Sequence, residues 1–311
     1  MAKILITEKV DPAGTDLLKA AGHEVVFADN DKEVIRREMP GTDAVFVRIA
    51  ELPGELLSLA ENLKIVSKHG VGYDNIDLEY CRKAGVAVTT TPNANGLSVA
   101  EHAFALMMTL AKNIIPVSGA YKKIGFAAKN YTPGMELTGK TLGLIGLGRI
   151  GGAFAKMCSC GFDMKVLAYD PYCKAAPEGV TLVKDVNEVI RQADVISLHC
   201  LLTDETRKMI NAERIAMMNE NAILINCARG PIIDEPALIE ALEQKKIGGA
   251  GLDVTDPEPV SPDSKLFTLD NVIVTPHYAP TTREASVRVS TIGCENILAV
   301  LEGREPVGEI A

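Results

Sequence analysis

The chain has 311 residues, of which 47% are hydrophobic and 23% charged, and its formal net charge is −9 at pH 7. This length fits two domains of ordinary size, and the composition is that of a globular chain. Because an acidic chain follows a phosphate backbone poorly, we expect no nucleic-acid partner.

Seven cysteines are present, an odd number with scattered spacing. Cys158 and Cys160 stand only two positions apart, which does not match the usual spacing of paired zinc ligands. We therefore expect reduced thiols, no metal site and a cytoplasmic location. The first ten residues lack the long apolar stretch of a signal peptide, and no apolar run approaches the roughly 20 residues of a membrane helix, so we expect no membrane partner.

Short apolar runs rich in β-branched residues alternate with helical patterns in the first part of the chain. We expect strands at residues 3–7, 23–27, 44–47, 65–67 and 86–89, with a helix at 15–20 after the first strand. Such alternation predicts a parallel sheet that is covered by helices on both faces. No glycine-rich turn follows the first strand, so this half is expected to be doubly wound and flavodoxin-like, without a dinucleotide fingerprint.

A long helical stretch at 97–119 separates this half from a second series of strands, which we expect at 141–145, 165–169, 195–198, 222–226, 249–252 and 272–275. Six strands match the size of a complete dinucleotide-binding sheet. The helical segment 283–301 is too small to stand alone and is expected to pack on the first domain. The prediction is an α/β fold with two doubly wound parallel-sheet domains. In it, a Rossmann NAD-binding domain (100–281) is inserted in a discontinuous flavodoxin-like substrate domain (1–99 and 282–311).

The sharpest motif is the glycine pattern at 146–151, GLGRIG, which follows an apolar strand and opens a helical segment. Gly146 permits a tight turn, Gly148 lets backbone N–H groups approach a pyrophosphate, and Gly151 lets the helix pack closely on the strand. The helix N-terminus supplies N–H donors and partial positive charge for the phosphates. The motif predicts a dinucleotide site.

Asp170 ends the next strand, 19 residues after Gly151. A carboxylate at this place can accept hydrogen bonds from the adenosine ribose hydroxyls and would repel a 2′-phosphate, so NAD is expected as the cofactor in preference to NADP. Lys174 lies nearby in sequence and weakens the expected exclusion of NADP.

Polar residues follow three successive strands of the second half. Arg229 comes after 222–226, Asp253 and Glu258 come after 249–252, and His277 comes after 272–275. Because ligands of open α/β sheets bind outside the carboxyl ends of the strands, we expect these side chains to meet at one edge.

This set of residue types suits hydride transfer to a 2-keto acid. Histidine can donate the proton and, in the reverse direction, accept it, and a nearby carboxylate such as Glu258 favours the charged imidazolium. The guanidinium of Arg229 can grip a substrate carboxylate and polarise the keto oxygen, and Gly230 beside it lets the backbone come close. Alone, His277 would more often be structural, Glu258 could be a loop charge and Arg229 a surface cation, so the prediction depends on their joint placement.

With these residues, the chain resembles the D-isomer-specific 2-hydroxyacid dehydrogenases, a family that includes D-3-phosphoglycerate dehydrogenases and hydroxypyruvate/glyoxylate reductases. The resemblance extends over nearly the whole chain. It is carried by HGVGYDNID (69–77), PNANGLSVAEHA (92–103), GKTLGLIGLGRIGG (139–152), LINCARGPIIDEPAL (224–238), GLDVTDPEP (251–259) and TPHYAPTTREA (275–285).

The resemblance implies NAD-dependent hydride transfer at C2 of a small D-2-hydroxy acid, by a catalytic set of Arg229, Glu258 and His277. It implies that Asp253 contacts the nicotinamide carboxamide and that members are usually dimers through the NAD domain. Backbone amides of the loop at Val71 and Gly72 would hold the substrate carboxylate. Arg149 and Ile150 match the positions that contact the pyrophosphate in this family. We also assign Cys227, the first residue after the 222–226 strand, to the cofactor site.

Substrate choice is expected to lie in the first domain. Arg48 and Lys68 follow strands there and could reach a second anionic group such as a phosphate, although each could be an ordinary surface cation. The segment around Arg48 resembles that of phosphoglycerate dehydrogenases, so 3-phosphoglycerate is the first choice. Hydroxypyruvate, glyoxylate and other short acids, sulfonated ones among them, stay open.

A function of another class also stays open, because the same family includes corepressor-like proteins that sense NAD(H) and retain the catalytic set. The absence of long interaction tails and the compact length favour an enzyme. The chain ends soon after its last helical segment, so we expect no regulatory C-terminal domain and no feedback through one.

Overall fold

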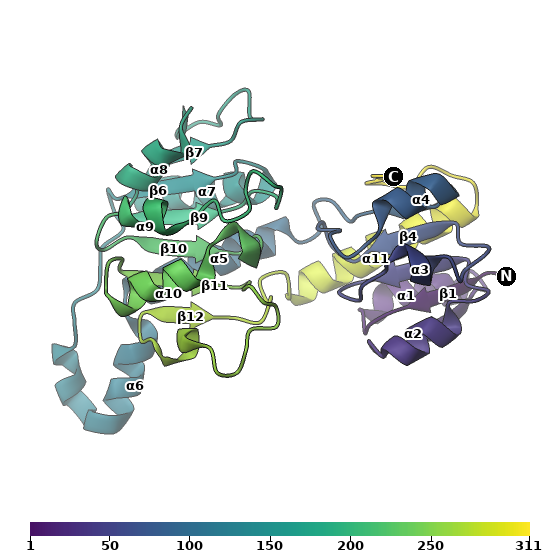
Figure 1. The fold of residues 1–311 in the computed structure, drawn as a ribbon, viewed down its shortest axis with the longest axis horizontal. Helices are drawn as coiled ribbons and strands as arrows, with labels where there is room; N and C mark the ends of the chain where they lie inside the picture. Colours follow the sequence, from purple (N-terminus) through teal and green to yellow (C-terminus); the bar gives the residue numbers. More distant parts are fainter. The chain divides into compact units, whose positions relative to one another are not determined.

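The computed structural model describes all residues of the chain, 1–311, and divides it into two compact units. The first unit consists of Met1–Asn95 with Thr281–Ala311, and the second of Gly96–Pro280. Each unit is built on its own parallel β-sheet (Figure 1). The expected fold class, two α/β units with parallel sheets, is confirmed.

The first unit has a five-stranded sheet in the order β2-β1-β3-β4-β5, with every pair of neighbours parallel. This order is the flavodoxin-like one that the sequence predicts. The last long helix of the chain packs against α1 and β4, as expected for a segment that cannot stand alone. The elements of this unit are β1 (Lys3–Ile6), α1 (Pro12–Ala20), β2 (Glu24–Phe27), α2 (Lys32–Glu38), β3 (Ala44–Val47), α3 (Gly54–Leu57), β4 (Ile65–Lys68), α4 (Leu78–Ala84), β5 (Ala87–Thr89) and α11 (Arg283–Leu301).

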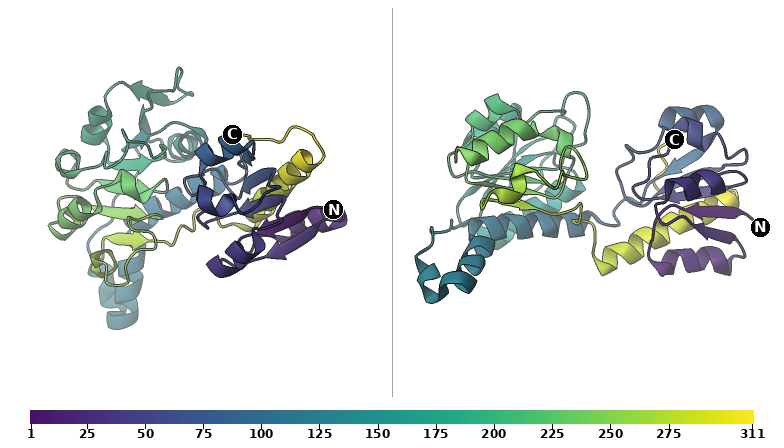
Figure 2. Two further views of the ribbon diagram at one scale, coloured as in Figure 1. Left: turned by 45° about the vertical axis from the view of Figure 1, so that its right-hand side comes forward. Right: turned by 60° about the horizontal axis from the view of Figure 1, so that its bottom comes forward.

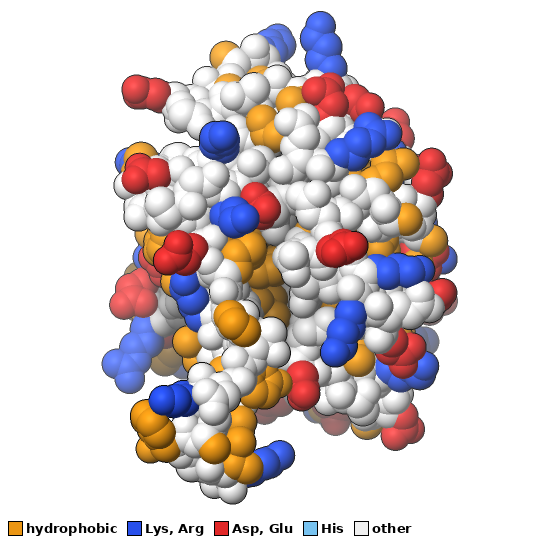
Figure 3. Space-filling view, turned by 90° about the vertical axis from the view of Figure 1, so that its left-hand side faces the viewer, with side chains coloured by type: hydrophobic (Ala, Val, Ile, Leu, Met, Phe, Trp, Pro, Cys, Tyr) orange, Lys and Arg blue, Asp and Glu red, His pale blue; other side chains and the backbone are white.

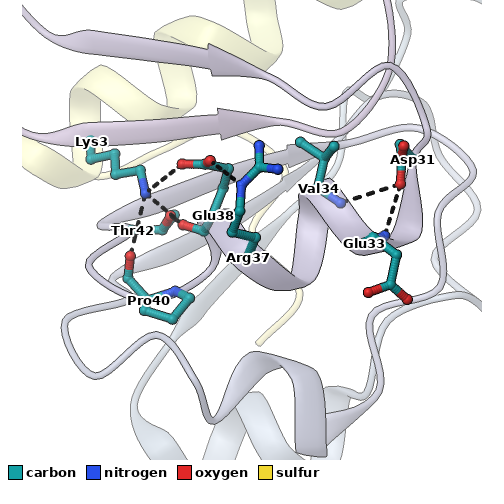
Figure 4. Close-up of polar contacts among 8 residues, drawn as sticks. All are labelled: Lys3, Asp31, Glu33, Val34, Arg37, Glu38, Pro40 and Thr42. Carbon is teal, nitrogen blue, oxygen red and sulfur yellow. Dashed lines mark hydrogen bonds and ion pairs between the residues drawn. The ribbon is translucent and has the colours of Figure 1, made fainter.

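Polar side chains fix the ends of α2 in this unit (Figure 4). At its start, Asp31 caps the helix by accepting hydrogen bonds from the N–H groups of Glu33 and Val34. At its end, Lys3 from β1 donates to the Glu38 carbonyl oxygen at 2.7 Å and pairs with the Glu38 carboxylate at 3.2 Å. Hydrogen bonds from Arg37 and then Lys3 lower the pKa of Glu38. The Asp31 contacts cap the first turn of the helix, and the Lys3 contacts join its last turn to the start of β1.

The second unit has a seven-stranded parallel sheet in the order β12-β11-β10-β9-β6-β7-β8. The strand order reverses between β9 and β6, which is the switch point where open α/β sheets bind ligands. The prediction of six strands is wrong by one, because β8 was missed. That strand lies at the sheet edge, has no buried residue and contains the exposed Thr181, so its sequence lacks the continuous apolar run of the buried strands. The strands are β6 (Thr141–Ile145), β7 (Lys165–Tyr169), β8 (Val180–Val183), β9 (Val195–Leu198), β10 (Ile223–Asn226), β11 (Gly249–Leu252) and β12 (Val272–Val274).

Helices cover both faces of this sheet. Alternate residues of one strand belong to different core clusters: Leu224 packs in one cluster, and Ile223 and Ile225 in the other. Since side chains alternate across a strand, both faces are buried. The helical segments of this unit are α5 (Gly96–Ala111), α6 (Ile114–Ile124), η1 (Gly125–Asn130), α7 (Arg149–Phe162), α8 (Val186–Gln192), α9 (Ala212–Ala216), η2 (Gly230–Ile232), α10 (Glu235–Glu243) and η3 (Lys265–Thr268).

The helical stretch expected at 97–119 is broken in two. Asn113 adopts a left-handed φ of 51° between α5 and α6. Pro116 explains the break, because proline lacks the N–H that a continuing helix would need and its ring would clash with the preceding turn. No single helix is long and apolar enough to cross a membrane; α5 with the segment Ile114–Asn130 passes that test only as a pair bent by 49°. The arm formed by α6 and η1 extends away from the sheet of this unit (Figure 2).

Candidate active site

A tight glycine turn joins β6 to α7 at the carboxyl edge of the second sheet. Gly146 has φ +95°, and a Cβ there would lie 2.6 Å from the backbone nitrogen of Cys200. A Cβ at Gly151 would lie 2.3 Å from the Gly146 carbonyl oxygen. Only glycine therefore fits at either place. A Cβ at Gly148, in contrast, would meet nothing within 4 Å, so open space lies in front of this backbone.

The start of α7 fits the phosphates of a dinucleotide. The N-cap residue is Gly148, so no N-cap side chain accepts hydrogen bonds from the first N–H groups of the helix. Arg149, which is exposed, and Ile150, which is half-buried, form the first turn. Free N–H donors and the partial positive charge of a helix N-terminus bind anions. The open space at Gly148 and this uncapped terminus are the observations on which the fit depends.

Asp170 lies directly after β7 and holds the glycine turn from the side. Its Oδ2 accepts a hydrogen bond from the N–H of Leu147 at 2.8 Å, and its Oδ1 accepts one from Tyr172 at 2.9 Å. The side chain is half-buried, and each carboxylate oxygen can accept a second hydrogen bond. Asp170 can therefore position the turn and still accept a hydroxyl donor.

His277 and Glu258 come from neighbouring strand ends and contact each other directly. The imidazole Nδ1 lies 2.7 Å from Glu258 Oε1, with 39% and 44% of the two side chains exposed. Glu258 stands between Pro257 and Pro259 in the segment after β11, and His277 follows β12. The pairing uses one ring nitrogen, and Nε2 has no hydrogen-bond partner within the protein. A carboxylate that holds one ring nitrogen orients the imidazole and leaves the other nitrogen able to exchange a proton.

Asp253 supports the turn that carries His277. The carboxylate is only 1% exposed and accepts hydrogen bonds from the N–H groups of Tyr278 at 2.7 Å and Ala279 at 2.9 Å. Its carbonyl oxygen accepts the N–H of His277 at 2.8 Å, and His277 itself has a left-handed φ of 51°. Because this conformation is uncommon for a residue with a side chain, the surrounding hydrogen bonds must stabilise it.

Two further side chains extend this support, and no motif in the sequence points to them in this role. The Thr275 hydroxyl donates to Asp253 Oδ1 at 2.6 Å. His102 on α5 places its Nε2 3.0 Å from the Thr275 oxygen and 3.5 Å from Asp253 Oδ1. His102 lies within the motif at 92–103, but it is far from Asp253 in sequence, and nothing in the motif indicates this contact.

Arg229 follows β10, the strand next to β11. Its Nη1 donates to the Ala228 carbonyl oxygen at 2.7 Å, and its own carbonyl oxygen accepts from Asn226 Nδ2 at 2.9 Å. The side chain is half-buried and takes part in further interactions. A Cβ at the adjoining Gly230 would lie 1.9 Å from the Thr255 carbonyl oxygen, so glycine there lets two backbone segments approach.

The cysteines are all free thiols. Burial raises the pKa of Cys158 and of Cys294 to about 12, and that of Cys81 and of Cys200 to about 11. Cys227 directly follows β10, and burial together with the Asp253 charge raises its pKa as well. It therefore lines the carboxyl edge as a neutral thiol rather than a nucleophile. No group of three or more His, Cys, Asp or Glu side chains is placed to hold a metal ion.

In the first unit, the expected substrate residues lie at the carboxyl ends of β3 and β4. Arg48 is half-buried, and Val71 and Gly72 lie in the loop after β4, with Val71 40% exposed. Lys68, expected either to reach the substrate or to be an ordinary surface cation, is only 7% exposed. Its Nζ donates to Asn75 Oδ1 at 2.7 Å and to the Arg48 carbonyl oxygen, so it is not a surface cation.

Residues 104–279 match the family model of the D-isomer specific 2-hydroxyacid dehydrogenase, NAD binding domain. The chain is 42% identical over 307 residues to a D-3-phosphoglycerate dehydrogenase of Methanocaldococcus jannaschii, with 97% of this chain and 58% of that protein covered. It is 39% identical to a hydroxypyruvate reductase of Thermotoga maritima, with 96% and 98% covered. The crystal structure of the TT0316 protein of Thermus thermophilus has a TM-score of 0.92 at 36% identity, with 99% of this chain and 100% of that chain covered.

These relatives differ in length. The chain spans somewhat more than half of the D-3-phosphoglycerate dehydrogenase that it matches, 58%, but nearly all of the hydroxypyruvate reductase, 98%. The family match covers the unit that holds the glycine turn and the His277–Glu258 pair. The chain belongs to the D-isomer specific 2-hydroxyacid dehydrogenase family, and its second unit contains the NAD-binding domain of that family.

Proposed function

We propose that the protein is an NAD-dependent dehydrogenase that transfers hydride between NAD(H) and C2 of a small D-2-hydroxy acid or 2-keto acid. The observation that carries the proposal is the 2.7 Å contact between His277 Nδ1 and Glu258 Oε1, at the edge of the sheet where the glycine turn also lies. An imidazole held by a carboxylate through one nitrogen can exchange a proton with a substrate through the other.

Each of the proposed catalytic residues has a separate role in the reaction. Bound NADH would supply the hydride to C2. His277 Nε2 donates the proton that the reduced carbonyl oxygen takes up, and takes it back in the oxidation. Glu258 keeps the ring oriented and stabilises its charged form, while Arg229 binds the carboxylate and polarises the carbonyl. General acid–base catalysis of this kind contributes on the order of 100- to 10,000-fold.

The proposed cofactor contacts begin at the glycine turn. Gly146, Gly148 and Gly151, with Arg149 and Ile150, would hold the pyrophosphate at the start of α7. Asp170 would accept hydrogen bonds from the ribose hydroxyls. Its negative charge would repel a 2′-phosphate, which is the reason for proposing NAD over NADP. Cys227 and Asp253 would lie beside the nicotinamide.

The proposed substrate is 3-phosphoglycerate in oxidation and phosphohydroxypyruvate in reduction. Similarity to a D-3-phosphoglycerate dehydrogenase and a cation at Arg48 support it. The first unit would bind the substrate, with Val71 and Gly72 holding the carboxylate through their amides. Hydroxypyruvate is the alternative that the similarity to a hydroxypyruvate reductase of nearly the same length supports.

A turnover panel tests the reaction and the substrate together. Phosphohydroxypyruvate, hydroxypyruvate, glyoxylate and sulfopyruvate are each offered with NADH and with NADPH, and the product is analysed for its D-isomer. We expect NADH oxidation with at least one acid and the highest kcat/KM for phosphohydroxypyruvate. Absence of turnover with all four acids would contradict the proposed activity, and a higher value for hydroxypyruvate would change only the substrate.

We further propose that two copies of the chain associate through the arm formed by α6 and η1. No residue of α6 is buried, and the arm exposes large hydrophobic side chains, with Ile124 59% and Phe126 73% exposed. Apolar side chains gather on this projection (Figure 3). A hollow of about 630 Å³ beside the base of the arm has Ile115 and Pro116 in its lining. Exposed apolar groups of this extent are typical of a protein interface.

Sedimentation tests this association. The double substitution Ile124→Asp with Phe126→Asp should convert a dimer to a monomer, because buried charges without partners are costly. Val307→Asp in the first unit, at an equally exposed apolar position, serves as the control and should leave the mass unchanged. A wild-type monomer, or a dimer that survives the double substitution, would contradict the proposal.

A further inference from the structure

The loop that follows β3 in the first unit, Arg48–Leu52, is held on both sides by side chains of other elements. Its N–H groups point to one carboxylate, and two of its carbonyl oxygens accept side-chain donors. Loops of this kind usually leave such groups to water. The loop therefore has one fixed conformation although it lies at the edge of the sheet.

Glu8 provides the carboxylate. It follows β1, is 7% exposed, and accepts three successive backbone hydrogen bonds: Oε2 from Arg48 at 2.8 Å, and Oε1 from Ile49 at 2.9 Å and Ala50 at 2.6 Å. The Thr7 hydroxyl donates to Oε2 as well. Hydrogen bonds to a charged acceptor are about twice as strong as neutral ones, and four of them compensate for burial of the charge.

Lys68 and Asn75 hold the other side of the loop. Lys68 donates to the Arg48 carbonyl oxygen and to Asn75 Oδ1, and Asn75 Nδ2 donates to the Ala50 carbonyl oxygen at 2.7 Å. The N–H of Leu52 donates to the Asn75 carbonyl oxygen at 2.8 Å. The ammonium group of Lys68 is thus buried and engaged inside the unit, which leaves Arg48 as the cation that this loop presents.

We infer that Glu8 is a positioning residue for substrate selection: it fixes the loop so that Arg48 presents its guanidinium to the second anionic group of the substrate, while Lys68 supports the loop instead of binding substrate. Arg48 is among the residues that line a hollow of about 250 Å³, with Glu8, Lys9, Asp29, Asn30 and Ile49. Because a guanidinium selects an anion through a fork of fixed geometry, a shift of its backbone by a fraction of an ångström weakens that selection. The inference rests on the proposed function, since it requires turnover of 2-keto acids.

The test compares phosphohydroxypyruvate with hydroxypyruvate, which share the reacting carbon and differ in the phosphate. Glu8→Gln keeps the shape of the side chain, but the NH₂ group of its amide would face backbone N–H groups of the loop in place of a carboxylate oxygen. We expect it to raise the KM for phosphohydroxypyruvate at least about tenfold relative to that for hydroxypyruvate, with kcat changed by less than about threefold. Glu51→Gln also removes one negative charge, but Glu51 lies in the loop itself and its side chain is exposed. This control should leave the ratio of KM values unchanged.

A double-mutant cycle separates positioning from a general loss of structure. If Glu8 acts through Arg48, Glu8→Gln adds little to the ratio of KM values in an Arg48→Ala background. Additive effects, or equal losses for both substrates, would overturn the inference. Glu8→Asp, which keeps the charge with a shorter reach, should give an intermediate ratio and replaces Glu8→Gln in the comparison if the amide variant does not fold. A wild-type protein that turns over neither acid defeats the proposed function first, whereas a wild-type enzyme with an unaffected Glu8→Gln variant defeats only the positioning role.

Discussion

A Cβ placed on Gly230 would lie 1.9 Å from the carbonyl oxygen of Thr255, so the segment that carries Arg229 and the segment that leads to Glu258 touch through a glycine. Two of the proposed catalytic side chains thus depend on one backbone contact between neighbouring strand ends.

Gly230→Ala should therefore separate these two segments. Because backbone atoms form the contact, the methyl group cannot be accommodated by a side-chain rotation, and overpacking of this kind costs about 1–3 kcal/mol. We expect a lower free energy of unfolding in urea and a kcat/KM reduced more than about tenfold, since the catalytic groups are misplaced. Gly161→Ala on α7, where a Cβ would meet nothing within 4 Å, is the matched control and should retain full activity. Retention of activity by Gly230→Ala would show that the contact does not position the site.

Asp253→Asn tests the support of the His277 turn. The asparagine keeps the shape, but one of its two terminal atoms becomes a donor that faces the N–H groups of Tyr278 and Ala279. A buried donor without a partner costs about 1–3 kcal/mol. We expect that loss in urea unfolding, and a larger loss in kcat than in NADH affinity. Unchanged unfolding and unchanged kcat would argue against the supporting role.

Most of the fold could be predicted from the sequence because buried parallel strands are short apolar runs. Strands such as β3 and β6 show that signal, whereas β8 at the sheet edge does not. Pro116 marked the interruption of the long helical stretch, but the apolar pattern continues across it and hid the break.

The candidate site could be predicted where a residue follows a strand, because the carboxyl ends of parallel strands share one edge. His277 and Glu258 follow neighbouring strands and lie in contact. The contacts of Glu8 and Thr275 could not be predicted, since they join segments far apart in sequence through backbone groups. Burial of Lys68 was missed for the same reason: its partners, Asn75 and the Arg48 carbonyl, become neighbours only in the folded unit.

Asp170→Ser should reduce the preference for NAD over NADP. The substitution removes the negative charge that would repel a 2′-phosphate, and Lys174 nearby in sequence could then favour that phosphate. We expect the ratio of kcat/KM for NADH to that for NADPH to fall at least about tenfold. Asp163→Ser, after the end of α7, removes an exposed charge of the same unit and is the control. An unchanged ratio would rule out the ribose contact.

Acid should destabilise the fold through two histidines. Burial, then the charge of Arg48, lowers the pKa of His69 to about 4, and burial lowers that of His199 to about 4. The unfolded chain therefore binds more protons than the folded one between about pH 4 and the ordinary histidine value of about 6.5. Above that window the free energy of unfolding should not depend on these histidines. As the pH falls through the window, the free energy of unfolding should decrease by about 1.4 kcal/mol per pH unit for each histidine.

Urea unfolding at several pH values checks this slope. His199→Gln removes one of the two groups and should make the dependence on pH shallower. A wild-type stability that rises as the pH falls from 6.5 to 5 would contradict the burial of neutral histidines.

The most direct test of His277 as the proton donor is the turnover of the His277→Ala variant, measured together with its affinity for NADH. The glycine turn and Asp170 are untouched in this variant, so the dissociation constant for NADH should change by less than about threefold, while kcat for keto-acid reduction falls by about 100- to 10,000-fold. A variant that turns over at the wild-type rate would show that the proton comes from another group.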